Sequence, residues 1–147
     1  MNVFQFVVAS DPVEIEAPAE RVWDILVDFE RYGVWNPFTT RVDASLEIGA
    51  PVMLHVTLGR LKRKQPERIE TVEPPQRLAW GTTIGHPLLL SALREQRVEA
   101  LSDTRCRYST TDATSGLLTP LVALLFGHLI RQGFNDMSAA LKARAEA

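Results

Sequence analysis

The side chains most often used for catalysis and metal binding are sparse in this sequence. Its three histidines are His55, His86 and His128, and no two of them have the i, i+4 spacing of a helical metal site. No His-Glu-x-x-His motif or carboxylate cluster accompanies them. His55 lies between Leu54 and Val56, so strand alternation turns it outward if those two face a core. We therefore expect no metal site.

The single cysteine offers little chemistry either. Arg105 and Arg107 flank Cys106 and could lower the pKa of its thiol, but strand alternation sends their side chains to the opposite face. One cysteine cannot form an internal disulfide or a thiolate zinc cluster. We expect a buried, inert thiol and a reducing, cytoplasmic setting.

Phosphate and nucleic-acid ligands also lose support. The chain contains no Gly-x-Ser-x-Gly elbow, Walker loop or Gly-x-Gly-x-x-Gly turn, so we expect no nucleotide cofactor and no cofactor of any other kind. Sixteen basic and eighteen acidic residues give a formal net charge of −2, which lacks the positive field that nucleic-acid binding requires.

The densest charge run is basic and lies in the middle of the chain. It comprises Arg60, Lys62, Arg63, Lys64 and Arg68. Such a run is typical of a solvated strand edge that discourages association between sheets, and an anion-binding patch is the alternative.

The elements that must position these side chains begin with a strand and a helical corner. Residues 13–17 alternate between apolar residues and glutamate, which predicts a half-buried strand that ends at Pro18. Residues 19–28 then change to helical spacing. A second short helix or turn fits residues 29–36, and Pro37 must end it because proline lacks a backbone donor.

Residues 39–113 contain only short runs separated by glycine and proline turns, which predicts an antiparallel meander. One strand places Val52, Leu54, Val56 and Leu58 on a single face, and another does the same with Leu78, Trp80, Thr82 and Ile84. Residues 91–101 and 104–112 form two further strands. In the first of these, Val98 and Ala100 compete with Leu93 and Leu101 for the inward face.

Residues 117–145 predict one long helix, with Pro120 in its first turn. At 100° per residue, an apolar stripe runs along its whole length and suits packing against a sheet. The stripe contains Val122, Phe126, Ile130, Phe134, Met137 and Leu141. The opposite side of the first half carries Leu117, Leu121, Leu124 and Leu125, with His128 at their margin.

Length and composition fit one ordinary domain over residues 1–147. Hydrophobic residues make up 46% and charged residues 23%, close to the globular average. No basic segment precedes the apolar amino-terminal run, so we expect no signal peptide. The uncharged stretch 115–130 is shorter than the roughly 20 residues that cross a bilayer, so we expect a soluble protein.

The order of strand, two short helices, six-stranded meander and long terminal helix is that of a helix-grip domain. Residues 13–38, which include the motif Trp35-Asn-Pro-Phe38, closely resemble the opening of the START-like (SRPBCC) superfamily, in particular its polyketide cyclase/dehydrase and lipid-transport-like branch. The resemblance continues through residues 49–56, 74–80 and 115–118. It implies an α+β helix-grip fold in which a curved antiparallel sheet wraps around the carboxyl-terminal helix.

The resemblance also implies an apolar cavity between sheet and helix that holds a small hydrophobic molecule such as a lipid, quinone or polyketide-like compound. Together with the strand pattern, it suggests a set of ligand-binding residues: Trp35, Phe38, Leu54, Val56, Trp80, Thr82, Gln96, Tyr108, Leu118 and Val122. Plain core packing is the alternative for each large side chain. A cyclase or dehydratase would need polar cavity groups, for which Tyr108, Thr82, Gln96 and Arg94 are the candidates.

Three functions therefore remain open. The first is a binding module, the second a cyclase or dehydratase enzyme, and the third an interaction protein with a vestigial cavity. The four exposed leucines of the long helix need a cover, which the Pro87–Leu90 hairpin, a second subunit in a homodimer or a membrane surface could supply. The hairpin is the favoured cover, because its own leucines need burial too.

Overall fold

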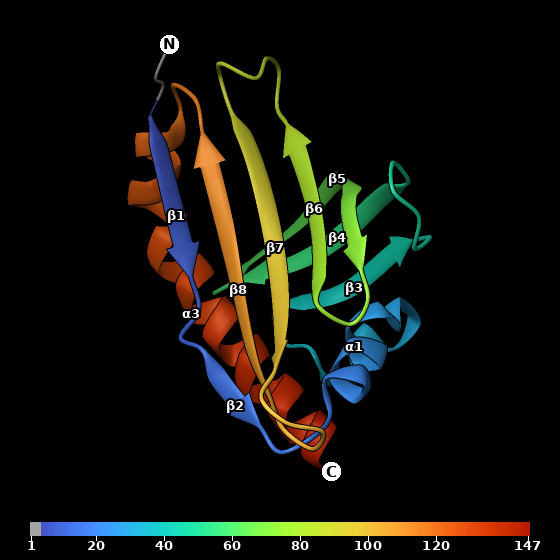
Figure 1. Cartoon of the computed structure of the whole chain (residues 1–147). Helices are drawn as coiled ribbons and strands as arrows, with labels where there is room; N and C mark the ends of the chain where they lie inside the picture. The colour runs from blue at the N-terminus through green and yellow to red at the C-terminus, as the bar shows by residue number, and fades with distance from the viewer. Residues whose placement is uncertain (1–3) are drawn as a thin grey trace.

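The computed structural model describes residues 4–147, in which an eight-stranded antiparallel sheet curls around one long helix (Figure 1). The strands pair in the order β1-β8-β7-β6-β5-β4-β3, and β2 pairs with β8. Strands β3 to β8 follow one another along the chain as the predicted six-stranded meander. Their bounds are Thr39–Ala44, Pro51–Leu58, Leu61–Glu73, Arg77–Thr83, Ser91–Ala100 and Cys106–Ser115. This is the helix-grip arrangement that the sequence predicted.

The amino-terminal end contains one strand more than the sequence suggested. Strand β1 (Gln5–Ala9) pairs with the second half of β8, and β2 (Val13–Ile15) pairs with its first half. We expected only the second of these strands. The apolar run in β1 shows no alternation, because Phe6 and Val7 stay exposed while Val8 is buried, so its periodicity did not mark it as a strand.

The helical corner agrees with the sequence pattern. Helix α1 (Ala19–Val27), a short 3₁₀ turn at Phe29–Arg31 and α2 (Tyr32–Trp35) lie between β2 and β3. The Asn36 side-chain oxygen accepts hydrogen bonds from the backbone N–H groups of Phe38 and Thr39, both at 2.9 Å. This bond pair fixes the chain reversal after Pro37 and brings Phe38 under the sheet.

Helix α3 (Thr119–Glu146) divides into two halves. Phe134, Met137 and Leu141 in its second half are fully buried. Phe126 and Ile130 occupy the same stripe and pack against this core but are only partly buried, so the predicted burial of the stripe is complete only in the second half. The reason is that the sheet leaves space opposite the first half of the helix.

The prediction that the Pro87–Leu90 hairpin covers the exposed leucines of the long helix is also wrong. The backbone N–H groups of Leu117 and Leu118 donate to the carbonyl oxygens of Leu88 and Leu89, at 2.9 and 3.0 Å. A Cβ added to Gly116, which has a φ of 118°, would lie 2.4 Å from the Leu89 carbonyl oxygen. The β6–β7 loop thus covers the backbone of the helix start and leaves the leucines exposed.

The basic run lies on a partly free strand edge, as expected. Residues 61–68 of β5 pair with β4, whereas pairing with β6 begins only at Arg68. Arg60, Lys62, Arg63 and Lys64 are all exposed. Separately, no helix within residues 4–147 combines the length and the apolar character that crossing a bilayer requires.

Candidate functional site

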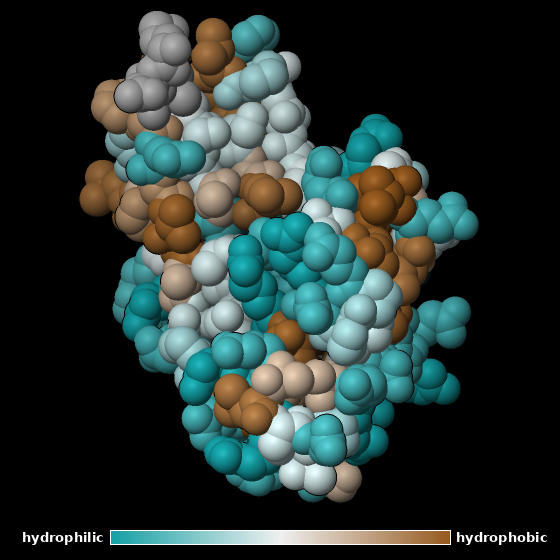
Figure 2. Space-filling model, viewed as in Figure 1, coloured by the Kyte–Doolittle hydropathy of each residue, from teal (hydrophilic) through white to brown (hydrophobic). Residues whose placement is uncertain are grey.

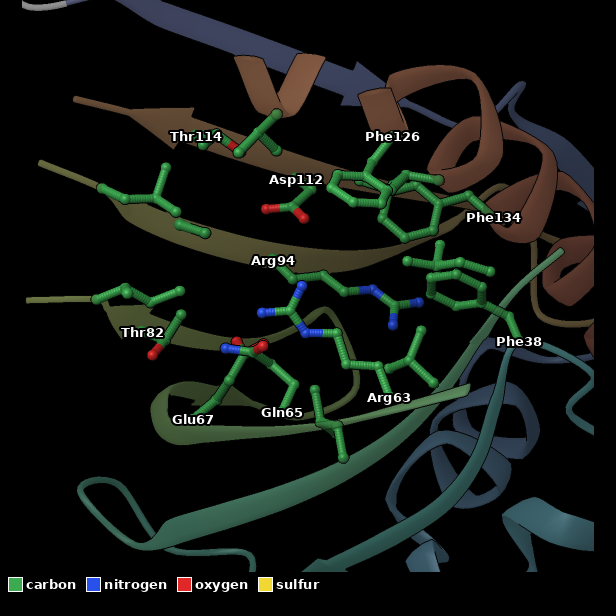
Figure 3. A pocket seen from close by; sticks show the side chains of 18 residues that line it. Phe38, Arg63, Gln65, Glu67, Thr82, Arg94, Asp112, Thr114, Phe126 and Phe134 are labelled. Atoms are coloured by element: carbon green, nitrogen blue, oxygen red, sulfur yellow. The ribbon is translucent and has the colours of Figure 1, made fainter. Parts of the chain in front are cut away.

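A cavity of about 160 Å³ lies between the first half of α3 and the concave face of the sheet (Figure 3). Most of its wall is apolar and comes from α3, β4, β7, the loop between β6 and β7 and the residue before β3: Phe38, Leu54, Val56, Leu58, Ile84, Leu90, Ala92, Val122, Phe126, Ile130 and Phe134. The remaining wall is polar and comes from β5 to β8: Arg63, Gln65, Glu67, Thr82, Arg94, Asp112 and Thr114.

Strand alternation and register explain why the polar groups converge. Thr82 of β6 pairs with Ala92 of β7, and Ala92 pairs with Thr114 of β8. Two residues further along each strand, Trp80 pairs with Arg94, and Arg94 pairs with Asp112. Residues two apart on a strand face the same side, so these two rows both face α3.

Arg94 is the central polar residue and is only 5% exposed. Its Nε donates to Thr110 Oγ1 at 3.3 Å, and its terminal nitrogens donate to Thr39 Oγ1 at 3.2 Å and to Met137 Sδ at 2.9 Å. The guanidinium carbon lies 4.7 Å from the centre of the Phe134 ring. Phe38 and Trp80 provide two further rings at 5.4 and 5.7 Å, so an aromatic cage holds this cation.

No carboxylate neutralises the buried guanidinium by a direct ion pair among the described residues. Asp112 faces Arg94 across the β7–β8 ladder, yet the arginine head turns away toward the aromatic cage. Asp112 Oδ1 is consequently buried without a hydrogen-bond partner in the described part of the chain. A buried acceptor without a partner is costly, which makes it a natural contact for a ligand donor.

Two carboxyl groups of the cavity have raised pKa values. Burial raises the pKa of Glu67 to about 8, and the nearby charge of Asp112 adds to the shift while Arg94 opposes it. Burial also raises the pKa of Asp112 to about 6, again against the effect of Arg94. Near neutral pH, Glu67 is therefore mainly protonated and Asp112 mainly ionised, so one group can donate a proton and the other accept one.

The mouth of the cavity lies where its lining residues become exposed. Arg63 is exposed, and Ile84 is 38% exposed, whereas Phe38 and Phe134 at the other end are buried. Figure 3 shows Asp112 and Glu67 pointing into the cavity from different strands, β8 and β5. The cavity is therefore open near Arg63 and Ile84 and closed at Phe38 and Phe134.

Five of the ten residues predicted to bind ligand line this cavity: Phe38, Leu54, Val56, Thr82 and Val122. The other five lie elsewhere. Trp80 is fully buried in the core beside Phe29, and Trp35 is half-buried between the two hydrophobic core clusters. Leu118 lies at the start of α3 and is 36% exposed.

Gln96 and Tyr108 form a hydrogen-bonded pair deeper in the sheet, in which Gln96 Nε2 has no partner among the described residues. The Tyr108 hydroxyl donates to Gln96 Oε1 at 2.6 Å, and both residues are buried. Burial raises the pKa of Tyr108 to about 12, so the phenol stays protonated at neutral pH. Both side chains lie beyond Arg94 as seen from the mouth, outside the set that lines the cavity.

Neither Glu67 nor Asp112 was predicted to line the cavity, although the strand pattern contained a signal for each. Asp112 lies four residues after Tyr108 on β8 and therefore faces the same side of the sheet, and Tyr108 was a predicted cavity residue. Glu67 has the parity of buried Ile69, but the neighbouring basic run suggested a strand exposed on both faces. Arg63 belongs to that run and nevertheless faces the cavity mouth.

The residues considered for other chemistry lie outside the cavity. Cys106 is buried, and burial raises the pKa of its thiol, which agrees with the predicted inert thiol. His55 Nε2 lies 3.5 Å from Asp43 Oδ2 on the outer face. Residues 4–147 contain no group of three or more His, Cys, Asp or Glu side chains that could hold a metal ion.

Comparison with known proteins agrees with this architecture. Residues 7–146 match the family described as polyketide cyclase / dehydrase and lipid transport. The chain belongs to this family. The branch of the START-like superfamily inferred from the sequence is thereby confirmed.

Several solved structures share the fold. The Zhui aromatase/cyclase from Streptomyces sp. R1128 is 20% identical, with a TM-score of 0.79 over 97% of this chain and 94% of that one. A START superfamily protein from Mycobacterium smegmatis is 18% identical, with a TM-score of 0.73 over 95% and 97% of the two chains. A norcoclaurine synthase from Thalictrum flavum is 13% identical, with a TM-score of 0.73 over 99% and 96%. A search of curated proteins gave no significant match.

Proposed function

We propose that this protein binds a small, mostly apolar molecule whose buried part is about the size of one aromatic ring. The observation that carries the proposal is the cavity of about 160 Å³ between α3 and the sheet. For scale, an engineered apolar cavity of about 150 Å³ in another protein holds one benzene molecule. A longer ligand would extend through the mouth past Arg63.

The polar wall specifies one end of this ligand. Arg94 uses three of its five N–H groups within the protein, which leaves two for an acceptor. Asp112 Oδ1 needs a donor, and protonated Glu67 can give or accept a hydrogen bond. A phenol matches both needs, because its hydroxyl can donate to Asp112 Oδ1 and accept from Arg94. A quinone or a cyclic ketone can only accept, from Arg94 or from protonated Glu67. In each case the apolar part would lie against Phe126 and Ile130.

Thermal unfolding with a panel of compounds tests this proposal. Phenol, 1,4-naphthoquinone and 2-tetralone serve as ring compounds, and palmitate serves as a chain compound. A ligand at about a hundred times its dissociation constant should stabilise the fold by roughly 2.7 kcal/mol. We expect the ring compounds to raise the melting temperature, and a panel without any shift would contradict the proposal.

A matched pair of variants locates the binding. Ala92 lines the cavity, whereas Ala113 faces the outer side of the adjacent strand β8. Ala92→Leu should fill the cavity and abolish the shift, and Ala113→Leu should retain it. Equal shifts in the two variants would place the ligand outside the cavity.

The paired carboxyl groups favour a second function, an enzyme of the cyclase or dehydratase type. Ionised Asp112 would remove a proton from the carbon next to a ligand carbonyl. The electron pair of the broken C–H bond would form the C=C bond, while the carbonyl oxygen would take the proton of Glu67 and give an enol, with a hydrogen bond from Arg94 stabilising the charge that develops on this oxygen. Return of one proton from Asp112 to the carbon and of the other from the oxygen to Glu67 would regenerate the ketone and both carboxyl groups.

Deuterium exchange distinguishes an enzyme from a binding module. The carbon-bound protons of 2-tetralone next to its carbonyl should exchange with D₂O faster in the presence of the protein, as measured by NMR. Asp112→Asn and Glu67→Gln should each lower this acceleration by roughly a hundredfold or more. Binding without any accelerated exchange would support the binding module alone.

A further inference from the structure

Large apolar side chains lie exposed along the first half of α3. The leucine face is defined as Leu117, Leu121, Leu124 and Leu125, and each of these residues is between 53% and 83% exposed to solvent. Figure 2 shows hydrophobic surface gathered at its upper left, where Figure 1 places β1 and the start of α3. Monomeric proteins rarely expose so large a contiguous apolar surface without a partner.

A cluster of positive charge lies along the flank of the same helix. The basic turn, defined as residues 59–64, comprises the turn between β4 and β5 and the first four residues of β5. It approaches α3, because a Cβ added to Gly59 would lie 3.5 Å from Leu129 Cδ2. Leu129 follows Leu125 by one helical turn. The turn carries Leu61, which is 46% exposed, among four exposed cations: Arg60, Lys62, Arg63 and Lys64.

Nothing among residues 4–147 neutralises these four cations by an ion pair. Arginines at the other end of the sheet behave differently, because each is paired with at least one glutamate: Arg77, Arg97, Arg105 and Arg107. In α3, no acidic residue precedes Asp136. A chain with a net charge of −2 thus keeps an unpaired positive cluster beside its exposed leucines.

We infer that the leucine face and the basic turn together dock on an anionic lipid bilayer. Leucine side chains would insert at the boundary between headgroups and acyl chains, and the cations would lie against lipid phosphates. Val122 of α3 and Arg63 of the basic turn line opposite walls of the cavity. Docking would therefore bring the cavity mouth close to the lipid surface.

The charge pattern favours a bilayer over a second copy of the chain. A two-fold dimer through the leucine face would pair the same surface with itself. Neither the leucine face nor the basic turn contains a carboxylate, so the two basic turns would have no opposite charge to meet within such an interface. An anionic bilayer supplies both the apolar layer and the negative charge.

Flotation with phospholipid vesicles tests this inference on the full chain, without any cavity ligand. We expect the protein to bind vesicles of phosphatidylcholine with about 30% phosphatidylglycerol, to bind pure phosphatidylcholine vesicles weakly, and to detach in about 0.5 M NaCl. Because no ligand is added, a negative result leaves the proposed cavity function unaffected, and a failed ligand panel leaves this inference unaffected.

Two double variants and their matched controls test whether the leucine face and the basic turn are the surfaces that bind the vesicles. Leu121→Glu with Leu124→Glu should raise the lipid concentration for half-maximal binding at least tenfold, and Lys62→Ser with Lys64→Ser about tenfold. The control Ile48→Glu with Leu93→Glu changes apolar residues elsewhere that are 70% and 39% exposed. Arg97→Ser with Arg105→Ser removes two cations at the other end of the sheet. Both controls should bind like the wild type.

Three results would overturn the inference. The first is an absence of wild-type binding to the anionic vesicles, and the second is equal binding by the leucine variant and its control. The third comes from light scattering: a wild-type dimer that Leu121→Glu with Leu124→Glu converts to a folded monomer would assign the leucine face to a second copy of the chain. Circular dichroism spectra verify that each variant is folded.

Discussion

The two halves of α3 have the same spacing of apolar residues, but the second half packs in the core and the first half borders a cavity. In the second half, Phe134, Met137 and Leu141 are at most 1% exposed and pack as a solid core. In the first half, Phe126 and Ile130 are half-buried and border a cavity. Helical periodicity therefore indicates which face of the helix is turned toward the sheet. The side chains on the sheet determine whether the space between helix and sheet is filled.

The facing side chains explain the difference. The second half of α3 contacts large residues in a hydrophobic cluster that includes Ile15, Leu26 and Tyr108. The first half faces the row formed by Thr82, Ala92 and Thr114, which are all small. Short side chains on a curved sheet cannot reach the helix, and a void therefore remains.

The largest expected effect is in the solid half. Phe134→Ala should lower the free energy of unfolding by about 3 to 5 kcal/mol, because it removes a buried ring that packs edge-on against Phe38 at 5.3 Å and lies under Arg94. Chemical denaturation measures this loss. Phe134→Leu keeps most of the volume and should lose much less.

Phe126→Ala tests the cavity half with the same substitution. We expect a loss of about 1 to 2 kcal/mol, because this ring is half-buried and already borders empty space. The same denaturation experiment gives the comparison. A loss equal to that of Phe134→Ala would mean that the two halves do not differ in packing.

The cavity half should also carry the pH dependence. The pKa of Glu67 is about 8 in the folded protein against an ordinary value of 4.5, so the folded state holds the proton more tightly. Its contribution to stability is therefore present below about pH 4.5 and lost as the pH rises through about 8. Glu67→Gln cannot ionise, and its stability relative to wild type should rise by roughly 3 to 4 kcal/mol between pH 5 and 8.5.

Thermal melts of both proteins across this range measure the difference. Asp112→Asn should show the same trend at lower pH, between its ordinary value of 3.8 and about 6. A Glu67→Gln difference that stays constant with pH would contradict the buried position of this carboxyl group.

The smallest effect is expected on the outer side of the same helix. Leu124 is 83% exposed, so Leu124→Lys should change the free energy of unfolding by about 0.5 kcal/mol or less. A thermal melt suffices to measure it. A loss of 2 kcal/mol or more would show that this side chain is buried in solution, by another part of the chain or by a partner.

Much of the fold could be predicted because its signals are local. The alternation in residues 13–17, the proline at position 37 and the apolar stripe of α3 each depend on neighbours within a few residues. Strand β1 escaped prediction because its burial is set by β8, more than a hundred residues away. The same limit applies to the cavity wall, of which the sequence indicated Phe38 and Thr82 but not Glu67.

Local sequence patterns were enough to predict the order of the elements from residue 13 onward, the superfamily and the inward face of most strands. Only the tertiary structure decided that Arg94 turns from Asp112 toward an aromatic cage, and that Glu67 and Asp112 share one cavity. The physical reason is that periodicity fixes which way a side chain points. What it meets depends on sheet curvature and register, which bring residues from five strands and one helix together around the cavity.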